Sequence, residues 1–352
     1  MAKKIAKEVL NTYSKTMSEI TPDLTVGDII RSGQYGEFAD YIFTDMTPDH
    51  WNNQLSAYGY ETTGIEKALH RMQELASDGE EYIHYIYGDE ERMANWDKKK
   101  VCLLHFPGPV KNRPYVLIIP GGALNRQWGL IEGQAIAAKI NELGYSAFVL
   151  FYRTKQEPVM DKSLEDMYKA IRYIEAKAGY FHVISGRYIL GGFSAGAILA
   201  QEIGAKNLGW QQQGVPKPEM VFLGYTACLF KEWYQTWKTL KNSDPAKEAS
   251  AVFLRKMGGP QFTLESLEPY QIQEYIDESY PPVYLVCNRD DKIVGVESTL
   301  CLDRCFVEMQ VPHITRIGRA GGHSFGLGNG LEVEGWLEEA VRFWNDMTSS
   351  KG

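Results

Sequence analysis

Hydrophobic residues follow two alternating patterns along most of the chain. Short, nearly continuous apolar runs indicate strands covered on both faces, and the stretches between them place apolar residues at helical spacing. This alternation predicts an α/β fold, with helices on both faces of a mostly parallel eight-stranded sheet. The first two runs are close enough in sequence to form an antiparallel start. The eight runs lie at 82–87, 101–106, 115–119, 147–152, 188–193, 221–225, 283–287 and 315–317.

Two segments depart from this alternation. Residues 1–78 are polar and aromatic with helix-like pieces at 24–43 and 64–77, and they predict an N-terminal helical extension to a main domain at 79–352. A structureless loop as long as 229–281 is improbable in a compact domain, so that segment predicts a small helical, lid-like insertion. We expect the extension and the insertion to roof the site together. The insertion's aromatic residues serve either to pack it on the body or to line a pocket.

Composition narrows the class of protein. The chain has 352 residues, of which 44% are hydrophobic, and a net charge of −8, so it can bury a large core but offers no basic surface for nucleic acid. It contains no run of about 18 apolar residues that would span a membrane. Its first residues are basic without the apolar centre of a secretory signal, which predicts a cytoplasmic protein.

The five cysteines show no disulfide framework, so reduced thiols are expected. Cys301 and Cys305 are four residues apart on a predicted helix, but no histidine or further cysteine lies near them in sequence. Cys228 and Cys287 fall in or beside apolar runs and are expected to be buried. The sequence therefore predicts no metal and no cofactor.

A serine stands where a predicted strand meets a run of small residues. Gly192-Phe-Ser194-Ala-Gly196 has the layout of a nucleophile elbow, a sharp turn that presents the serine hydroxyl. Side chains at the two glycine positions would clash with neighbouring backbone in so tight a turn. The pentapeptide alone is weak evidence, and the rest of the chain has to supply its partners.

A serine nucleophile needs a base, and the base needs an orienting acid; in this fold they follow in the order serine, acid, histidine. His323 lies in a glycine-rich loop after the last predicted strand and is the predicted base. Asp290 and Asp291 are adjacent in the loop after the run at 283–287. We predict Asp291 as the acid, because Asp-x-x-Val places its carboxylate in the turn, and we keep Asp290 as the alternative.

Backbone amides must also stabilise the oxygen of a tetrahedral intermediate. Ala195 follows the serine directly, and Gly122 and Ala123 follow the run at 115–119. These three residues are the predicted oxyanion donors. The alternative is an ordinary turn at Pro120-Gly-Gly.

Together these features resemble the α/β-hydrolases, and more narrowly the bacterial feruloyl-esterase-like and acetyl-xylan-esterase-like branch. The resemblance covers about 100–345. It implies Ser194 as nucleophile, His323 as general base and acid, Asp291 as orienting acid, and Gly122, Ala123 and Ala195 as oxyanion donors. Family loops often have histidine where Pro120 stands and glycine where Ala123 stands, so the donor pair stays open. The matching pieces are Pro120-Gly-Gly-Ala123, Glu132-Gly133, Gly144-Tyr-Ser-Ala-Phe-Val-Leu-Phe-Tyr152-Arg153, Gly192-Phe-Ser-Ala-Gly196, Asp291 with Val294, and Gly321-Gly-His323-Ser-Phe-Gly326.

The leading functional hypothesis is a carboxylic-ester hydrolase that acts on a small-molecule ester with a short acyl group, such as an O-acetylated sugar. Amidases, formamidases and exopeptidases use the same parts for acyl transfer and form the second hypothesis. A non-catalytic relative is the third, although every expected triad residue is present. Neither nucleic acid nor membrane is an expected partner, and a homo-oligomer is left open.

Overall fold

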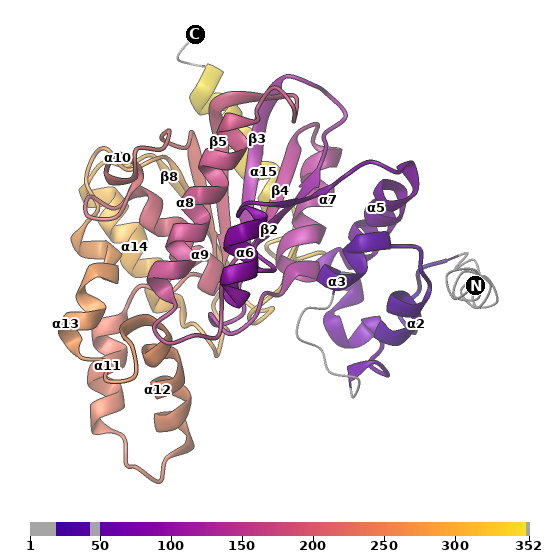
Figure 1. Ribbon diagram of the computed structural model, residues 1–352. Helices are drawn as coiled ribbons and strands as arrows, with labels where there is room; N and C mark the ends of the chain where they lie inside the picture. Colours follow the sequence, from indigo (N-terminus) through magenta and orange to yellow (C-terminus); the bar gives the residue numbers. More distant parts are fainter. Residues whose placement is uncertain (1–18, 43–49, 350–352) are drawn as a thin grey trace.

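One eight-stranded sheet forms the centre of the molecule (Figure 1). The computed structural model describes residues 19–42 and 50–349. The strands are β1 (Ile83–Tyr85), β2 (Cys102–Phe106), β3 (Arg113–Ile119), β4 (Ser146–Phe151), β5 (Val183–Phe193), β6 (Met220–Gly224), β7 (Val283–Asn288) and β8 (His313–Gly318). Their order is β1-β2-β4-β3-β5-β6-β7-β8; β2 is antiparallel to β1 and β4, and the other pairs are parallel. The predicted fold and its antiparallel start are confirmed.

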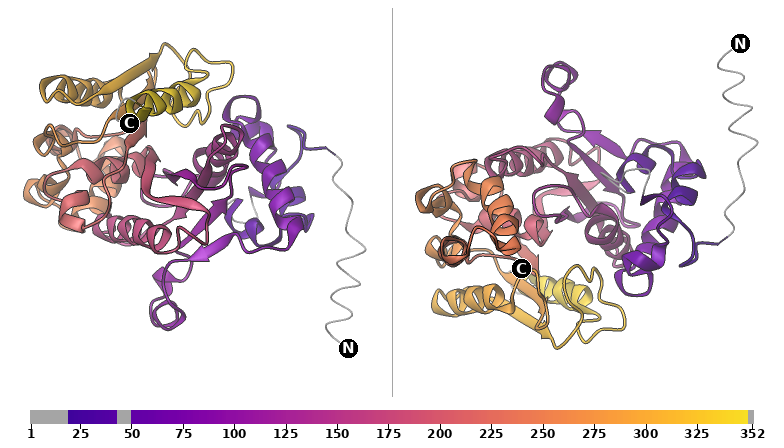
Figure 2. Two further views of the ribbon diagram at one scale, coloured as in Figure 1. Left: turned by 90° about the horizontal axis from the view of Figure 1, so that it is seen from above. Right: turned by 90° about the horizontal axis from the view of Figure 1, so that it is seen from below.

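Helices cover both faces of this sheet, as Figure 2 shows from above and below. Successive strand residues point to opposite faces: in β3, Tyr115 and Leu117 join one apolar cluster, and Val116 and Ile118 join the other. The first cluster is covered by α8 (Met160–Ala176), α9 (Ala195–Gln201) and α14 (Val296–Glu308), and the second by α7 (Ala135–Glu142) and α15 (Trp336–Ser349).

The N-terminal segment adds helices to the second face. These are α2 (Val26–Arg31), α3 (Ala39–Ile42) and α5 (Ile65–Asp78), and α5 packs against α7. Ile65, Leu69 and Met72 of α5 are fully buried in the second cluster. The predicted helical extension is confirmed for the described residues; 1–18 and 43–49 lie outside them.

The insertion at 229–281 is helical, as predicted, and lies at the lower left of Figure 1. It contains α11 (Phe230–Thr239), α12 (Pro245–Gly258) and α13 (Leu264–Leu267), and α12 packs against α8. Its aromatic rings contact one another: the centroids of Trp237 and Phe262 are 4.7 Å apart. Packing therefore accounts for these two aromatic residues.

Shorter helical segments complete the described chain. They are η1 (Gly36–Phe38), η3 (Leu55–Tyr58), α4 (Tyr60–Thr63), α6 (Asp89–Ala94), η4 (Trp96–Lys98), η5 (Leu130–Gln134), η6 (Glu202–Gly204), α10 (Trp210–Gln213), η7 (Glu268–Tyr270) and η8 (Ile272–Glu274). No helix in the described ranges has the length and apolar character needed to cross a bilayer. The cysteines are all reduced, and Cys228 and Cys287 are buried, as expected.

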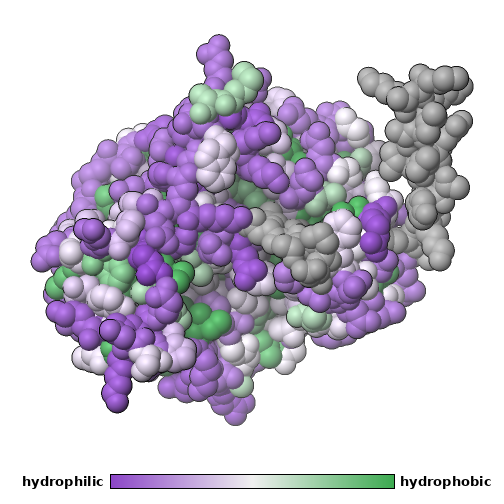
Figure 3. All heavy atoms as spheres, turned by 60° about the horizontal axis from the view of Figure 1, so that its bottom comes forward, coloured by the Kyte–Doolittle hydropathy of each residue, from purple (hydrophilic) through white to green (hydrophobic). Residues whose placement is uncertain are grey.

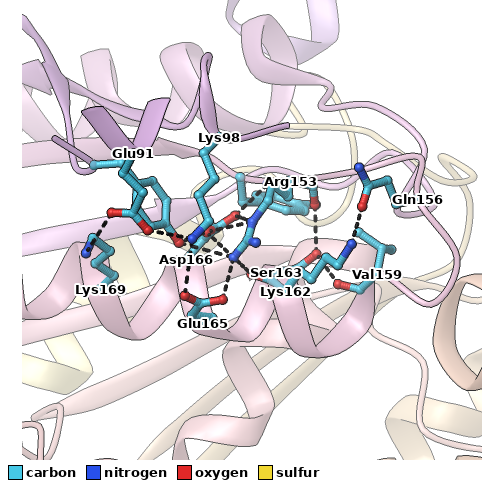
Figure 4. Close-up of polar contacts among 12 residues, drawn as sticks. Glu91, Lys98, Arg153, Gln156, Val159, Lys162, Ser163, Glu165, Asp166 and Lys169 are labelled. Atoms are coloured by element: carbon cyan, nitrogen blue, oxygen red, sulfur yellow. Dashed lines mark hydrogen bonds and ion pairs between the residues drawn. The ribbon is translucent and has the colours of Figure 1, made fainter. Parts of the chain in front are cut away.

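A buried ion pair fixes the loop after β4 to α8 (Figure 4). The Asp166 side chain is fully buried, and its carboxylate accepts hydrogen bonds from the backbone amide of Arg153 at 2.7 Å and from the guanidinium at 2.8 Å. Glu165 also pairs with this guanidinium at 2.7 Å, but its side chain is 55% exposed. Burial raises the pKa of Asp166, whereas its hydrogen bonds and ion pair with Arg153 oppose that shift.

The difference in burial between these two acids predicts a difference in stability. Asp166→Ala leaves the Arg153 guanidinium buried without its main partner, which we expect to lower the free energy of unfolding by about 3–5 kcal/mol. Glu165→Ala removes a solvent-screened pair and should cost about 1 kcal/mol or less. Urea denaturation of both variants measures this, and equal losses would contradict the assigned role of Asp166.

Glu202 predicts a pH dependence of stability. It follows α9 directly and is fully buried, and burial raises the pKa of its carboxyl from about 4.5 to about 8. Between these values the folded protein keeps the proton that the unfolded chain loses, so stability falls as pH rises, by at most about 1.4 kcal/mol per unit. Denaturation midpoints between pH 5 and 8 should show this fall in wild type and a shallower one in Glu202→Gln. Parallel pH profiles would refute it.

Candidate active site

Ser194 stands on the sharp turn between β5 and α9. Its backbone has φ 50° and ψ −122°, outside the conformations that a serine ordinarily adopts. The neighbouring strand β6 stabilises the turn: the Ser194 amide donates a hydrogen bond to the carbonyl of Gly224, at the end of β6, at 2.9 Å. A strained residue persists only where its surroundings enforce it. The predicted elbow geometry is therefore present.

The two glycines of the elbow are required by close approach. A Cβ at Gly192 would lie 2.3 Å from the carbonyl oxygen of Gly196, and a Cβ at Gly196 would lie 2.0 Å from the carbonyl oxygen of Ile119. Both contacts are with backbone, which cannot move aside as a flexible side chain could. These glycines let α9 begin directly beside the end of β3.

The structure brings the predicted base and acid to this serine. His323 Nε2 lies 2.9 Å from Ser194 Oγ, and His323 Nδ1 lies 2.6 Å from Asp291 Oδ2. The His323 side chain is 8% exposed, and that of Asp291 is fully buried. With Nδ1–H donating to the carboxylate, Nε2 is left to accept a proton from the serine.

The adjacent aspartates, Asp290 and Asp291, have different hydrogen-bond partners. The second oxygen of Asp291, Oδ1, accepts from the amides of Ile293 at 2.8 Å and Val294 at 3.0 Å, so the carboxylate is held in its turn. Asp290 instead accepts from the amides of Gly321 at 3.3 Å and Gly322 at 2.8 Å. Those bonds lower the pKa of Asp290. The structure thus places Asp291 on the histidine and Asp290 on the loop that carries it.

The predicted oxyanion donors lie beside the serine. Gly122, Ala123 and Ser194 line the same cavity, and Ala195 begins the helix after the serine. Within the described residues, the amides of Gly122, Ala123 and Ala195 have no internal acceptor. Ala123 has φ 54°, a conformation that glycine adopts without strain. These amides are available to a substrate oxygen.

A buried acid that the sequence did not assign to the site supports this arrangement. Glu132 is fully buried, accepts from the Gly121 amide and from the Tyr225 hydroxyl, both at 2.8 Å, and also bonds the Ser324 side chain. Burial raises the pKa of Glu132. It ties the loop before Gly122 to the residue after the histidine. In the sequence, Glu132 stands out only as part of the resemblance to the esterase branch. Hydrophobic periodicity can mark a residue as buried, but it does not identify the residue's partner.

The cavity around Ser194 has a volume of about 550 Å³, within the usual range for a small-molecule site. The N-terminal segment forms part of its wall through Ala57, Tyr58, Gly59, Thr62 and Thr63. None of its described lining residues comes from the insertion. The N-terminal extension, one of the two segments expected to roof the site, thus lines the cavity. A lid role for 229–281 stays a prediction.

The face of the molecule at the bottom of Figure 1 is mostly hydrophilic, with smaller hydrophobic patches (Figure 3). In the ranges that the structure describes, no three histidine, cysteine, aspartate or glutamate side chains are grouped so that they could hold a metal ion.

The BD-FAE family model matches residues 104–305. The chain belongs to the BD-FAE family. This match contains the elbow and both aspartates and ends before His323. A curated relative of this BD-FAE protein, endo-1,4-beta-xylanase B from Butyrivibrio fibrisolvens, is 23% identical over 308 residues. The alignment takes in 85% of this chain and 44% of the relative, so the chain spans less than half of that protein's length.

Solved structures share the fold of this BD-FAE protein. The acetyl ester-xyloside bifunctional hydrolase from Caldicellulosiruptor lactoaceticus has a TM-score of 0.62 and 20% identity, and covers 76% of this chain and 96% of its own. Esterase B from Lactobacillus rhamnosis has a TM-score of 0.59 and 17% identity, and covers 77% and 86%. At such identities the likeness establishes an α/β-hydrolase fold.

Proposed function

We propose that this protein is a serine hydrolase that cleaves small carboxylic esters with a short acyl group, such as acetyl esters of sugars, through an acyl-serine intermediate. The observation that carries the proposal is the contact chain from Ser194 through His323 to Asp291, beside three backbone amides without an internal acceptor. The names of the similar xylanase and acetyl ester-xyloside hydrolase support a carbohydrate ester as substrate.

The geometry supports two successive acyl transfers. Ser194 Oγ attacks the ester carbonyl carbon while His323 Nε2 takes its proton, and the amides stabilise the resulting oxyanion. Collapse expels the alcohol, which receives its proton from His323 and leaves an acyl-serine. Water then attacks this second ester while His323 takes its proton, and His323 returns the proton to Ser194 Oγ as the acid departs. Asp291 stays a carboxylate and stabilises the imidazolium in both halves.

Pre-steady-state kinetics with p-nitrophenyl acetate test the proposal. If deacylation is slower than acylation, we expect a burst of about one equivalent of p-nitrophenol per enzyme, followed by steady turnover. Parallel assays with butyryl and longer esters, acetylated xylan and the corresponding anilide define the acyl length and the bond. Faster cleavage of the anilide than of the ester, or no turnover across this panel, would overturn the proposal.

A further inference from the structure

One arginine in the cavity wall, Arg126, forms no ion pair with an acid of the described residues. Of the described residues that line the cavity, Arg126 is the only one with a permanent charge. It is half-buried, and within the described chain it forms no ion pair. This cation stands out because the chain as a whole carries a net charge of −8.

The backbone holds Arg126 close to the oxyanion amides. The amides of Asn125 and Arg126 both donate to the carbonyl of Gly122, at 3.0 and 3.2 Å. A Cβ at Gly122 would lie 2.3 Å from the carbonyl oxygen of Arg126, so the chain folds back tightly on itself here. The arginine therefore sits one turn after the residue predicted to bind the substrate oxygen.

Its side chain is positioned by stacking. The guanidinium carbon lies 4.8 Å from the ring centroid of Trp128, which also lines the cavity. A guanidinium on an aromatic face keeps its N–H groups free at the edge, in the fork geometry that matches a carboxylate. The two buried acids of the site have other partners, since Asp291 faces His323 and Glu132 faces Gly121.

From this placement we infer that the alcohol half of the natural substrate carries a carboxylate, which Arg126 binds. The inference rests on the proposed function: with a short acyl group on Ser194, most of a cavity of about 550 Å³ remains for the alcohol half. The substrate class is thus an acyl ester of a hydroxy acid, including a sugar that bears a carboxylate. Arg126 is a specificity residue and takes no part in the bond changes.

A matched pair of substrates tests the inference. 4-Acetoxybenzoate and 4-acetoxybenzamide have nearly the same shape and differ in one negative charge on the alcohol half. We expect the ratio of their kcat/KM values, acid over amide, to fall about tenfold or more in Arg126→Gln, because a charge-assisted hydrogen-bond pair is lost. Arg126→Lys should restore part of the ratio. Arg172→Gln, which makes the same charge change on the exposed face of α8, should leave it unchanged.

Two further arms separate this inference from the proposed function. Calorimetric binding of both esters to Ser194→Ala needs no turnover: the benzoate should bind more tightly, and the added Arg126→Gln change should remove that preference. Equal binding of the two esters, or an acid-to-amide ratio that Arg126→Gln leaves intact, would overturn the inference while ester hydrolysis stands. A loss confined to mono-4-nitrophenyl succinate, with its carboxylate on the acyl half, would overturn the assignment to the alcohol half.

Discussion

The Ser194→Ala variant is expected to lose about 10⁴- to 10⁶-fold in kcat on p-nitrophenyl acetate, because among the described residues the Ser194 hydroxyl is the one that hydrogen-bonds the predicted base, His323 Nε2. Residual hydrolysis would come from binding and the oxyanion amides alone. The loss appears in steady-state rates and in the disappearance of the burst.

The control for this variant is a thermal melt, which shows whether it is still folded. Alanine at 194 keeps the Cβ and the hydrogen bond from the backbone amide to the Gly224 carbonyl, so the melting temperature should stay within a few degrees of wild type. A folded Ser194→Ala protein with more than about one tenth of wild-type kcat would show that another nucleophile does the chemistry.

The Asp291→Asn variant is expected to lower kcat by about 10⁴-fold. An amide at 291 can still accept from Ile293 and Val294, so the turn survives. With its oxygen on those amides, its NH₂ group faces His323 Nδ1 as a donor. The imidazole then favours the wrong tautomer, and its protonated form loses the negative charge that stabilises it.

The matched control is Asp290→Asn, one residue away. Its Oδ1 accepts from the Gly322 amide at 2.8 Å and its Oδ2 from the Gly321 amide at 3.3 Å, so asparagine can keep the shorter bond and loses the longer one. We expect a kcat loss of about tenfold or less. If Asp290→Asn lost more activity than Asp291→Asn, the two roles read from the hydrogen bonds would be reversed.

Much of this arrangement could be predicted from the sequence because it is local. The elbow is fixed by two glycines and a serine at short spacing, and the apolar run of β5 leads directly into it. The order of strands also placed His323 and the aspartates at one edge of the sheet. Chain position therefore brings these residues to one edge of the sheet, and the hydrogen bonds decide which of the two aspartates contacts His323.

The rest depends on contacts between distant segments. Nothing in the pattern around Glu132 reveals that Gly121 and Tyr225 both bond its carboxylate. Likewise, the aromatic content of the insertion suggests a roof, but Trp237 and Phe262 pack edge to face against each other, and the cavity is lined instead by Ala57, Tyr58, Gly59, Thr62 and Thr63. Hydrophobic periodicity identifies a buried face, and it does not say which segment covers that face.

Mass spectrometry after reaction with a fluorophosphonate identifies the residue that acts as nucleophile. We expect one phosphonyl group per protein, located on Ser194 in the tryptic peptide 188–206, which forms rapidly in wild type and much more slowly in His323→Ala. An unlabelled protein, or a label on any other residue, would contradict this expectation.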